Sequence, residues 1–114
     1  MSNKPSKTDV LQGTLDLMVL HTLDSLGALH GYAIAARLEQ VSGGALQLNM
    51  GTLYPALMRL EQRGLVRGNW GTTDTNRKAR YYALTSAGRR QLTRERAAWD
   101  QMAGIIHTVL HAKG

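Results

Sequence analysis

The stretch that decides the fold reads Gly51-Thr52-Leu53-Tyr54-Pro55-Ala56-Leu57-Met58-Arg59-Leu60-Glu61-Gln62-Arg63-Gly64-Leu65-Val66. Leu53, Leu57 and Leu60 recur at the spacing of one helix face and predict a helix over residues 51–63 that packs on that side. The opposite face carries a different set of side chains, namely Thr52, Pro55, Arg59 and Arg63. Such a helix can pack with one side and bind an acidic polymer with the other.

Two residues set the expected limits of this helix. Proline lacks an N–H group and clashes with the carbonyl four residues back, so Pro55 fits best in a first turn. The helix is therefore expected to begin near Gly51 or Thr52, with Thr52 as a candidate cap. Gly64 can adopt the left-handed conformation that commonly closes a helix.

Positive charge is concentrated around and after this helix. The chain has 114 residues and a formal net charge of +6. Residues 59–96 contain ten basic and three acidic residues, and nine of the ten basic ones are arginine. Arginine suits phosphate and guanine contacts, which favours a nucleic acid as the partner. The alternative is a solvated basic face without a binding role.

The remaining elements follow from the spacing of apolar residues and from turn residues. We expect helices at 10–26, 30–42 and 86–111, a very short strand at 46–48, and a hairpin of strands 65–70 and 80–84. Thr85 is expected to cap the last helix. This order predicts a mainly α (α+β) winged helix-turn-helix, in which helix 51–63 enters the DNA major groove and the hairpin forms the wing.

The domain division follows from the same elements. Residues 1–8 are expected to be a flexible N-terminal arm, residues 9–84 the winged helix-turn-helix domain, and residues 85–114 a long C-terminal dimerisation helix. Winged helices also serve as protein-interaction modules, so a module without DNA-binding function is the alternative to a DNA-binding regulator.

Four short motifs carry a resemblance to a known family over residues 11–110. They are Leu29-His30-Gly31-Tyr32-Ala33-Ile34, Gly51 to Glu61, Arg77-Lys78-Ala79-Arg80-Tyr81-Tyr82, and Leu84-Thr85-Ser86-Ala87-Gly88. Together they resemble the PadR family of bacterial transcriptional regulators, in its short subfamily, and are similar to its multidrug-responsive members. The resemblance implies a homodimeric repressor that binds double-stranded DNA at a palindromic operator and is often released by a small molecule. It also implies that Thr52, Tyr54 and Pro55 begin the recognition helix and that Arg77, Lys78 and Arg80 lie in or beside the wing.

Each of these side chains has a chemistry that suits DNA. The hydroxyls of Thr52 and Tyr54 can bind phosphates or base edges, and the ring of Pro55 can touch a thymine methyl group. Arg59 is expected nearer the bases and Arg63 nearer the phosphates. Tyr54 has the alternative of a packed core or hinge residue.

Two further expectations concern neighbouring segments. Tyr81 and Tyr82 alternate across a strand, so one of them is expected in the core. Backbone N–H groups near residues 30–32, at the start of a helix, can hold a phosphate.

The last helix carries a second apolar pattern. Leu92, Trp99 and Ile106 are seven residues apart, as are Met102 and Val109, which predicts a dimer seam. The alternative is packing on the chain's own first helix. Trp99 matches a tryptophan of multidrug-responsive members, so a small aromatic effector is predicted to bind Trp99, with Arg96 pairing with an anionic group. A tryptophan can also anchor an interface without a ligand role, and Arg96 can simply extend to water.

Other classes of function find no support in the sequence. The chain has no cysteine, which excludes disulfides and thiolate chemistry. His107 and His111 have the spacing of a metal pair without a third ligand nearby, so neither a metal nor a cofactor is expected. No nucleophile, paired-carboxylate or phosphate-loop pattern predicts an enzyme. The absence of a signal peptide or membrane span from the sequence predicts a cytoplasmic protein without a membrane partner.

Overall fold

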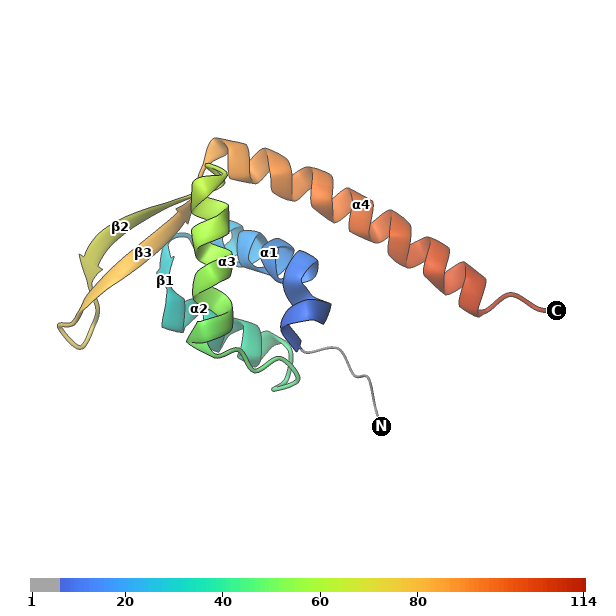
Figure 1. The fold of residues 1–114 in the computed structure, drawn as a ribbon, viewed down its shortest axis with the longest axis horizontal. Helices are drawn as coiled ribbons and strands as arrows, with labels where there is room; N and C mark the ends of the chain where they lie inside the picture. Colours follow the sequence, from blue (N-terminus) through green and yellow to red (C-terminus); the bar gives the residue numbers. More distant parts are fainter. Residues whose placement is uncertain (1–6) are drawn as a thin grey trace.

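The structure, a computed structural model, describes residues 7–114, with side chains from residue 13 onward. Its elements are α1 (Lys7–Leu26), β1 (Leu29–His30), α2 (Gly31–Val41), α3 (Met50–Gln62), β2 (Val66–Thr72), β3 (Lys78–Leu84) and α4 (Ser86–Leu110). Helices α1, α2 and α3 pack together, the hairpin of β2 and β3 projects from them, and α4 extends away on the other side (Figure 1). This arrangement confirms the predicted winged helix-turn-helix. Residues 1–6 of the predicted N-terminal arm lie outside the described residues, and residues 7 and 8 of that arm belong to α1.

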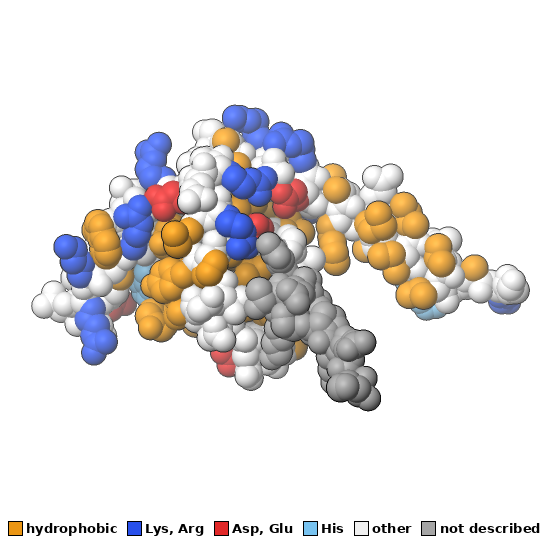
Figure 2. Space-filling model, in the orientation of Figure 1, with side chains coloured by type: hydrophobic (Ala, Val, Ile, Leu, Met, Phe, Trp, Pro, Cys, Tyr) orange, Lys and Arg blue, Asp and Glu red, His pale blue; other side chains and the backbone are white. Residues whose placement is uncertain are grey.

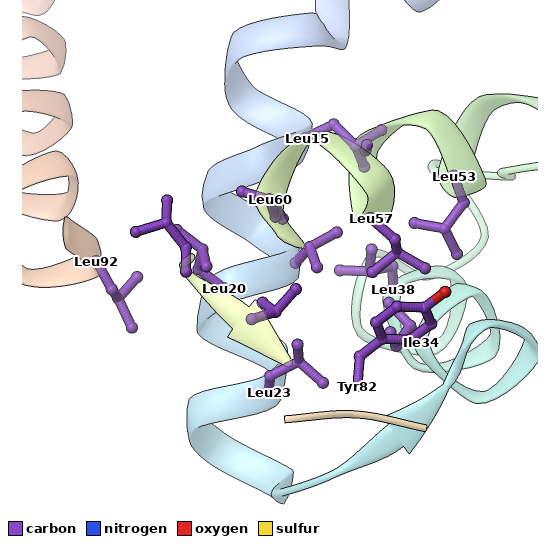
Figure 3. Close-up of a cluster of buried hydrophobic side chains, with 14 residues drawn as sticks. Leu15, Leu20, Leu23, Ile34, Leu38, Leu53, Leu57, Leu60, Tyr82 and Leu92 are labelled. Atoms are coloured by element: carbon purple, nitrogen blue, oxygen red, sulfur yellow. The ribbon is translucent and has the colours of Figure 1, made fainter. Parts of the chain in front are cut away.

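One aliphatic core holds the helices and the wing together. The predicted inner face of α3 is confirmed, because Leu53, Leu57 and Leu60 are fully buried. They meet side chains of α1, α2 and the wing in the cluster of Figure 3, including Leu20, Ile34 and Tyr82. Tyr82 is buried and Tyr81 only partly so, which confirms that one tyrosine of the pair belongs to the core.

The sheet contains three antiparallel strands in the order β1-β3-β2. Leu29 and His30 pair with Tyr82 and Tyr81, so the outer edge of β3 is occupied by the segment before α2. The predicted strand at 46–48 is wrong, because these residues lie in the connection between α2 and α3 without pairing in the sheet. Their alternation has another cause, since Leu46 and Leu48 are partly buried against the core.

Helix α3 begins one residue earlier than predicted, and a different residue caps it. The side chain of Asn49 accepts a hydrogen bond from the Thr52 N–H at 2.9 Å, so Asn49 is the cap and the expectation for Thr52 is wrong. Asparagine is among the strongest capping residues. Pro55 consequently lies in the second turn, where its missing N–H leaves the Gly51 carbonyl without the usual helical hydrogen bond. Gly64 closes the helix with a φ of +73°, as expected.

The start of α4 is fixed by a capping hydrogen bond and by a hydrogen bond to the turn between α3 and β2. Thr85 caps the helix as predicted, accepting from the Gly88 N–H at 3.0 Å, and its hydroxyl donates to the Gly64 carbonyl at 2.7 Å. A Cβ atom at Gly88 would lie 2.0 Å from the Leu65 carbonyl oxygen, so only glycine permits this close approach. The motif Leu84 to Gly88 therefore joins α4 to the end of α3 and the beginning of β2.

The two halves of α4 lie in different surroundings. Leu92 is 3% exposed in the chain's own core, so its predicted place at a dimer interface is wrong. The second half leaves the domain, and the chain has a radius of gyration of 16.0 Å, against about 13 Å for a compact chain of this length. No helix in the described part of the chain is long and apolar enough to cross a membrane.

Candidate nucleic-acid interface

The exposed side of α3 is formed by residues three and four apart, opposite the buried leucines. We call this set the outer stripe: Gly51, Tyr54, Pro55, Met58 and Gln62. Met58 is 58% exposed and Tyr54 40%. Thr52 and Arg59 are only partly exposed at one margin of the stripe, and Arg63 is exposed at the end of the helix. The prediction of an outward-facing side chain is therefore correct for Pro55. The exposed face is centred on the outer stripe, and Thr52 and Arg59 lie at its margin.

Arg59 is held by α1. Its Nη2 donates to the Asp16 Oδ1 at 3.0 Å, which directs the guanidinium toward α1. The Asp16 side chain is only 14% exposed. Burial raises the pKa of the Asp16 carboxyl above its ordinary value, and the nearby Arg59 charge opposes this shift without cancelling it. This ion pair fixes α3 against α1. It also engages the guanidinium of Arg59, the residue that the sequence predicts to lie nearer the bases.

Arg80 is likewise held within the chain. One carboxylate oxygen of Glu61, on α3, accepts from the Arg80 Nη2 at 2.6 Å and from the Gly68 N–H at 3.3 Å. Because Arg80 is on β3 and Gly68 on β2, a single α3 side chain binds both strands of the wing. The Arg80 guanidinium also lies near the rings of Trp70 and Tyr82, at 5.8 and 5.9 Å from their centroids. The arrangement sets the position of the wing relative to α3.

The tip of the wing carries exposed positive charge. Arg77 and Lys78 are both exposed at the end of the hairpin. The turn between the strands is closed by two backbone hydrogen bonds, from Thr73 N–H to the Arg77 carbonyl and from Asn76 N–H to the Thr73 carbonyl. Lys78 lies 5.3 Å from the centroid of the exposed Trp70 ring. The wing thus presents cations and an aromatic surface on a well-bonded hairpin.

A concave surface lies between the wing and the N-terminal ends of α2 and α3. It encloses about 640 Å³ and is lined by Tyr32, Tyr54, Trp70 and the cations of the wing. His30 caps α2 by accepting from the Ala33 N–H at 3.3 Å. A Cβ atom at Gly31 would lie 2.7 Å from the Met50 Cε, so a larger residue there would displace the end of the Met50 side chain, whereas the Tyr54 ring, 3.5 Å from the same position, lies in ordinary contact with the start of α2. Tyr54 is therefore a partly exposed residue at the α2–α3 junction.

A second cavity of about 420 Å³ lies between α1, α2 and α4. Trp99 and Arg96, the two residues predicted to bind a ligand, both line it. Arg96 also contacts the His21 ring of α1. Apolar side chains complete the wall, namely Leu17, Met18, Leu26, Leu38 and Val41. The structure thus brings the predicted pair together on a mainly apolar surface with a few polar groups, which is typical of small-molecule sites.

Metal-ligand side chains do not gather in the described residues. His107 and His111 stack with ring centroids 4.2 Å apart on α4. Within the described chain there is no group of three or more histidine, aspartate or glutamate residues placed to hold a metal ion.

Positive and apolar side chains share one face of the molecule. Figure 2 shows hydrophobic side chains over α3 and Lys and Arg side chains over the wing and the far end of α3. Sequence reasoning missed Met58, Gln62 and the role of Glu61. The first two were detectable, because they follow Pro55 by three and seven residues on the side opposite the leucines. The Glu61 contacts were not, because they join residues on three separate elements.

Comparison with known proteins shows which family this chain matches. The model of the "Transcriptional regulator PadR-like family" matches residues 19–94, two thirds of the chain. A 37.1 kDa protein in a transposon of Streptomyces fradiae is 45% identical over 80 residues, covering 70% of this chain and 21% of that protein. A transcriptional regulator of Mycobacterium tuberculosis is 38% identical over 65 residues, 57% of this chain and 60% of that protein. The chain thus spans about a fifth of the first relative's length and less than two thirds of the second's.

The fold has a solved counterpart. A transcriptional regulator from Clostridium thermocellum superposes with a TM-score of 0.79 at 26% identity, over 88% of this chain and 96% of that one. The matching family is one of transcriptional regulators and not of enzymes, and a regulator is among the relatives. A basic wing beside an exposed helix on a winged helix-turn-helix fits DNA binding, and the chain belongs to the PadR-like family of DNA-binding transcriptional regulators.

Proposed function

We propose that this regulator is a homodimeric repressor of a palindromic operator and that a small aromatic effector releases it from DNA. The observation that carries the proposal is the separation of two surfaces on one chain. The outer stripe and the cations of the wing lie together at one end, while the second half of α4 presents an apolar face at the other (Figures 1 and 2).

The DNA contacts follow from which side chains are exposed. Helix α3 enters the major groove, and Tyr54 and Pro55 approach the bases or the adjoining phosphates. Arg63, Arg77 and Lys78 are exposed and bind the phosphate backbone. Arg59 and Arg80 contribute indirectly, since their guanidinium groups hold α3 against α1 and the wing against α3.

The dimer is supported by the far half of α4. Trp99, Met102, Ile106 and Val109 are between 47% and 67% exposed on one side of the helix, joined there by Ile105 and Leu110. Apolar side chains at this spacing pack against a second helix. A twofold dimer presents two copies of α3, so the operator is expected to be a palindrome with half-sites about 10 base pairs apart or a multiple of that distance.

The effector site is supported by the cavity between α1, α2 and α4. Its volume of about 420 Å³ is in the range of pockets that bind drug-sized molecules. Trp99 offers a flat aromatic surface, and Arg96 offers a positive group for an anionic substituent. Helix α1 lines the cavity through Leu17 and contacts α3 through Asp16, so one helix adjoins both the effector and the recognition helix.

The DNA-binding part is tested by fluorescence anisotropy with the duplex upstream of the protein's own gene. Specific binding should weaken steeply with salt, because each neutralised phosphate releases counterions. A log–log salt slope near zero, or equal affinity for scrambled DNA, would contradict it. Footprinting should reveal two half-sites related by a twofold axis.

The effector is tested by the fluorescence of Trp99. The chain has two tryptophans, so the Trp70→Phe variant reports on Trp99 alone. A flat aromatic compound is expected to quench this fluorescence and to lower DNA affinity over the same concentration range. The Trp99→Ala variant, if it remains dimeric, should stay on DNA at that concentration. Quenching without any change in DNA affinity would refute release by that compound.

A further inference from the structure

The outer stripe of α3 contains no charged residue. Its members are Gly51, Tyr54, Pro55, Met58 and Gln62, and the most exposed large apolar side chain among them is Met58. Pro55 and Met58 are three residues apart and are therefore neighbours on the helix surface. The middle of the surface that would face base edges is thus apolar, with the Tyr54 hydroxyl on one side of it along the helix and one amide, Gln62, a turn further on.

Two of the charged residues beside the stripe, Arg59 and Glu61, are already engaged within the chain. Arg59 donates to Asp16 on α1 at 3.0 Å, and Glu61 accepts from Arg80 and from the Gly68 N–H. Arg63 lies at the C-terminal cap of α3, farthest from the end that recognition helices usually direct into the groove. The usual means of identifying guanine, an arginine directed at its O6 and N7 atoms, is therefore missing from the centre of this surface.

An apolar surface in the major groove has one natural counterpart among the standard bases. Thymine alone presents a methyl group there, and apolar side chains discriminate it by contact. A methionine side chain is flexible and fits irregular apolar surfaces. The exposed cations of the wing are placed to hold the phosphates, so the stripe itself needs no charge to dock.

We infer that α3 identifies its half-site mainly through thymine C5-methyl groups, which Pro55 and Met58 contact, rather than through arginine–guanine hydrogen bonds. The inference rests on the proposed docking of α3 in the major groove. It makes Met58 a specificity-determining residue and Arg59 a positioning residue.

The experiment begins with a random duplex library from which the full-length protein selects its binding site. Each thymine of the selected site is then replaced in turn by deoxyuridine, which removes only the methyl group. Affinities are measured by fluorescence anisotropy at one salt concentration. We expect one or two thymines per half-site at which the replacement weakens binding about fourfold, as the loss of one buried methyl group predicts.

Variants assign the methyl contact to a side chain. In Met58→Ala, deoxyuridine at the sensitive position should cost nothing further, because the partner of the methyl group has gone. The matched control Met58→Leu keeps an apolar side chain and should retain the sensitivity. Met58 is exposed, so all three proteins should unfold at similar temperatures. Arg59→Ala should lower affinity for all sequences and leave the thymine preference intact.

The outcomes separate this inference from the proposed function. If no duplex is selected, the proposed docking fails and the inference falls with it. Selection of a site that is insensitive to every deoxyuridine replacement would leave docking intact and overturn methyl recognition. Sensitivity that persists unchanged in both Met58→Ala and Pro55→Ala would overturn the assignment to these residues. A guanine preference that disappears in Arg59→Ala would overturn it as well.

Discussion

The two halves of α4 share one apolar repeat and differ in what covers it. Leu92, in the first half, is 3% exposed within the chain's own core, whereas Ile106, two heptads later, is 47% exposed. Thr85 and Gly88 hold the start of the first half against the turn between α3 and β2, and the second half projects from the domain (Figure 1). A heptad spacing therefore tells which side chains share a face and leaves open which partner covers that face. The first half belongs to the fold, and the second is the proposed dimer surface.

The largest expected effect is a difference in the free energy of unfolding between variants in the two halves of α4. Leu92→Ala should lower the free energy of unfolding by about 2–5 kcal/mol, because it leaves a cavity in the core. Ile106→Ala should cost much less when unfolding is measured at a protein concentration low enough to disfavour dimers. Urea unfolding followed by circular dichroism checks both variants. Equal losses would mean that the two halves contribute alike to the folded chain.

The next effect concerns assembly rather than folding. Ile106→Glu should raise the dimer dissociation constant by roughly 30-fold or more, the equivalent of a hot-spot change of about 2 kcal/mol. Sedimentation equilibrium measures it, and the helical signal of the monomer should be preserved. Gln101→Glu adds the same charge on another side of α4 and is the matched control. A dimer equally weakened by both variants would indicate general charge repulsion rather than a seam.

The smallest effect tests whether charge or packing holds the first half. Arg89 on α4 donates to Asp24 on α1 at 3.2 Å, and both side chains are well exposed. Exposed pairs contribute about 0–1 kcal/mol, so Asp24→Asn should change the unfolding free energy by no more than that. The residual effect should vanish in high salt. A loss as large as that of Leu92→Ala would mean that this ion pair, rather than the apolar contact, holds α4 to the domain.

Local signals were sufficient for much of the fold. The leucine spacing of α3, the closing glycine at residue 64 and the Thr85 cap were all correctly predicted, because each acts over a few residues. The strand at 46–48 was wrongly predicted, since alternation there reflects half-burial in a connection rather than pairing. The position of Pro55 favours a later start of α3, whereas Asn49 caps the helix and extends it by one residue toward the N-terminus.

The candidate site was predictable in outline and not in its contacts. Charge clustering identified the wing, and Arg77 and Lys78 are exposed as a phosphate-binding surface requires. Arg59 and Arg80 carry the same charge and are held by Asp16 and Glu61 instead. Those partners lie 43 and 19 residues away in sequence, so no local pattern distinguishes a cation that is free to bind DNA from one that positions an element.

The amino-acid sequence by itself determined the order of helices and strands, the buried side of α3 and the basic character of the hairpin. These depend on periodicity, capping and composition, which operate within one or two helical turns. Only the tertiary structure decided that Glu61 joins α3 to both wing strands, that Leu92 is a core residue, and that Asp16 holds Arg59. Each of these depends on which distant side chains meet, because burial and ion pairing are properties of neighbours in space.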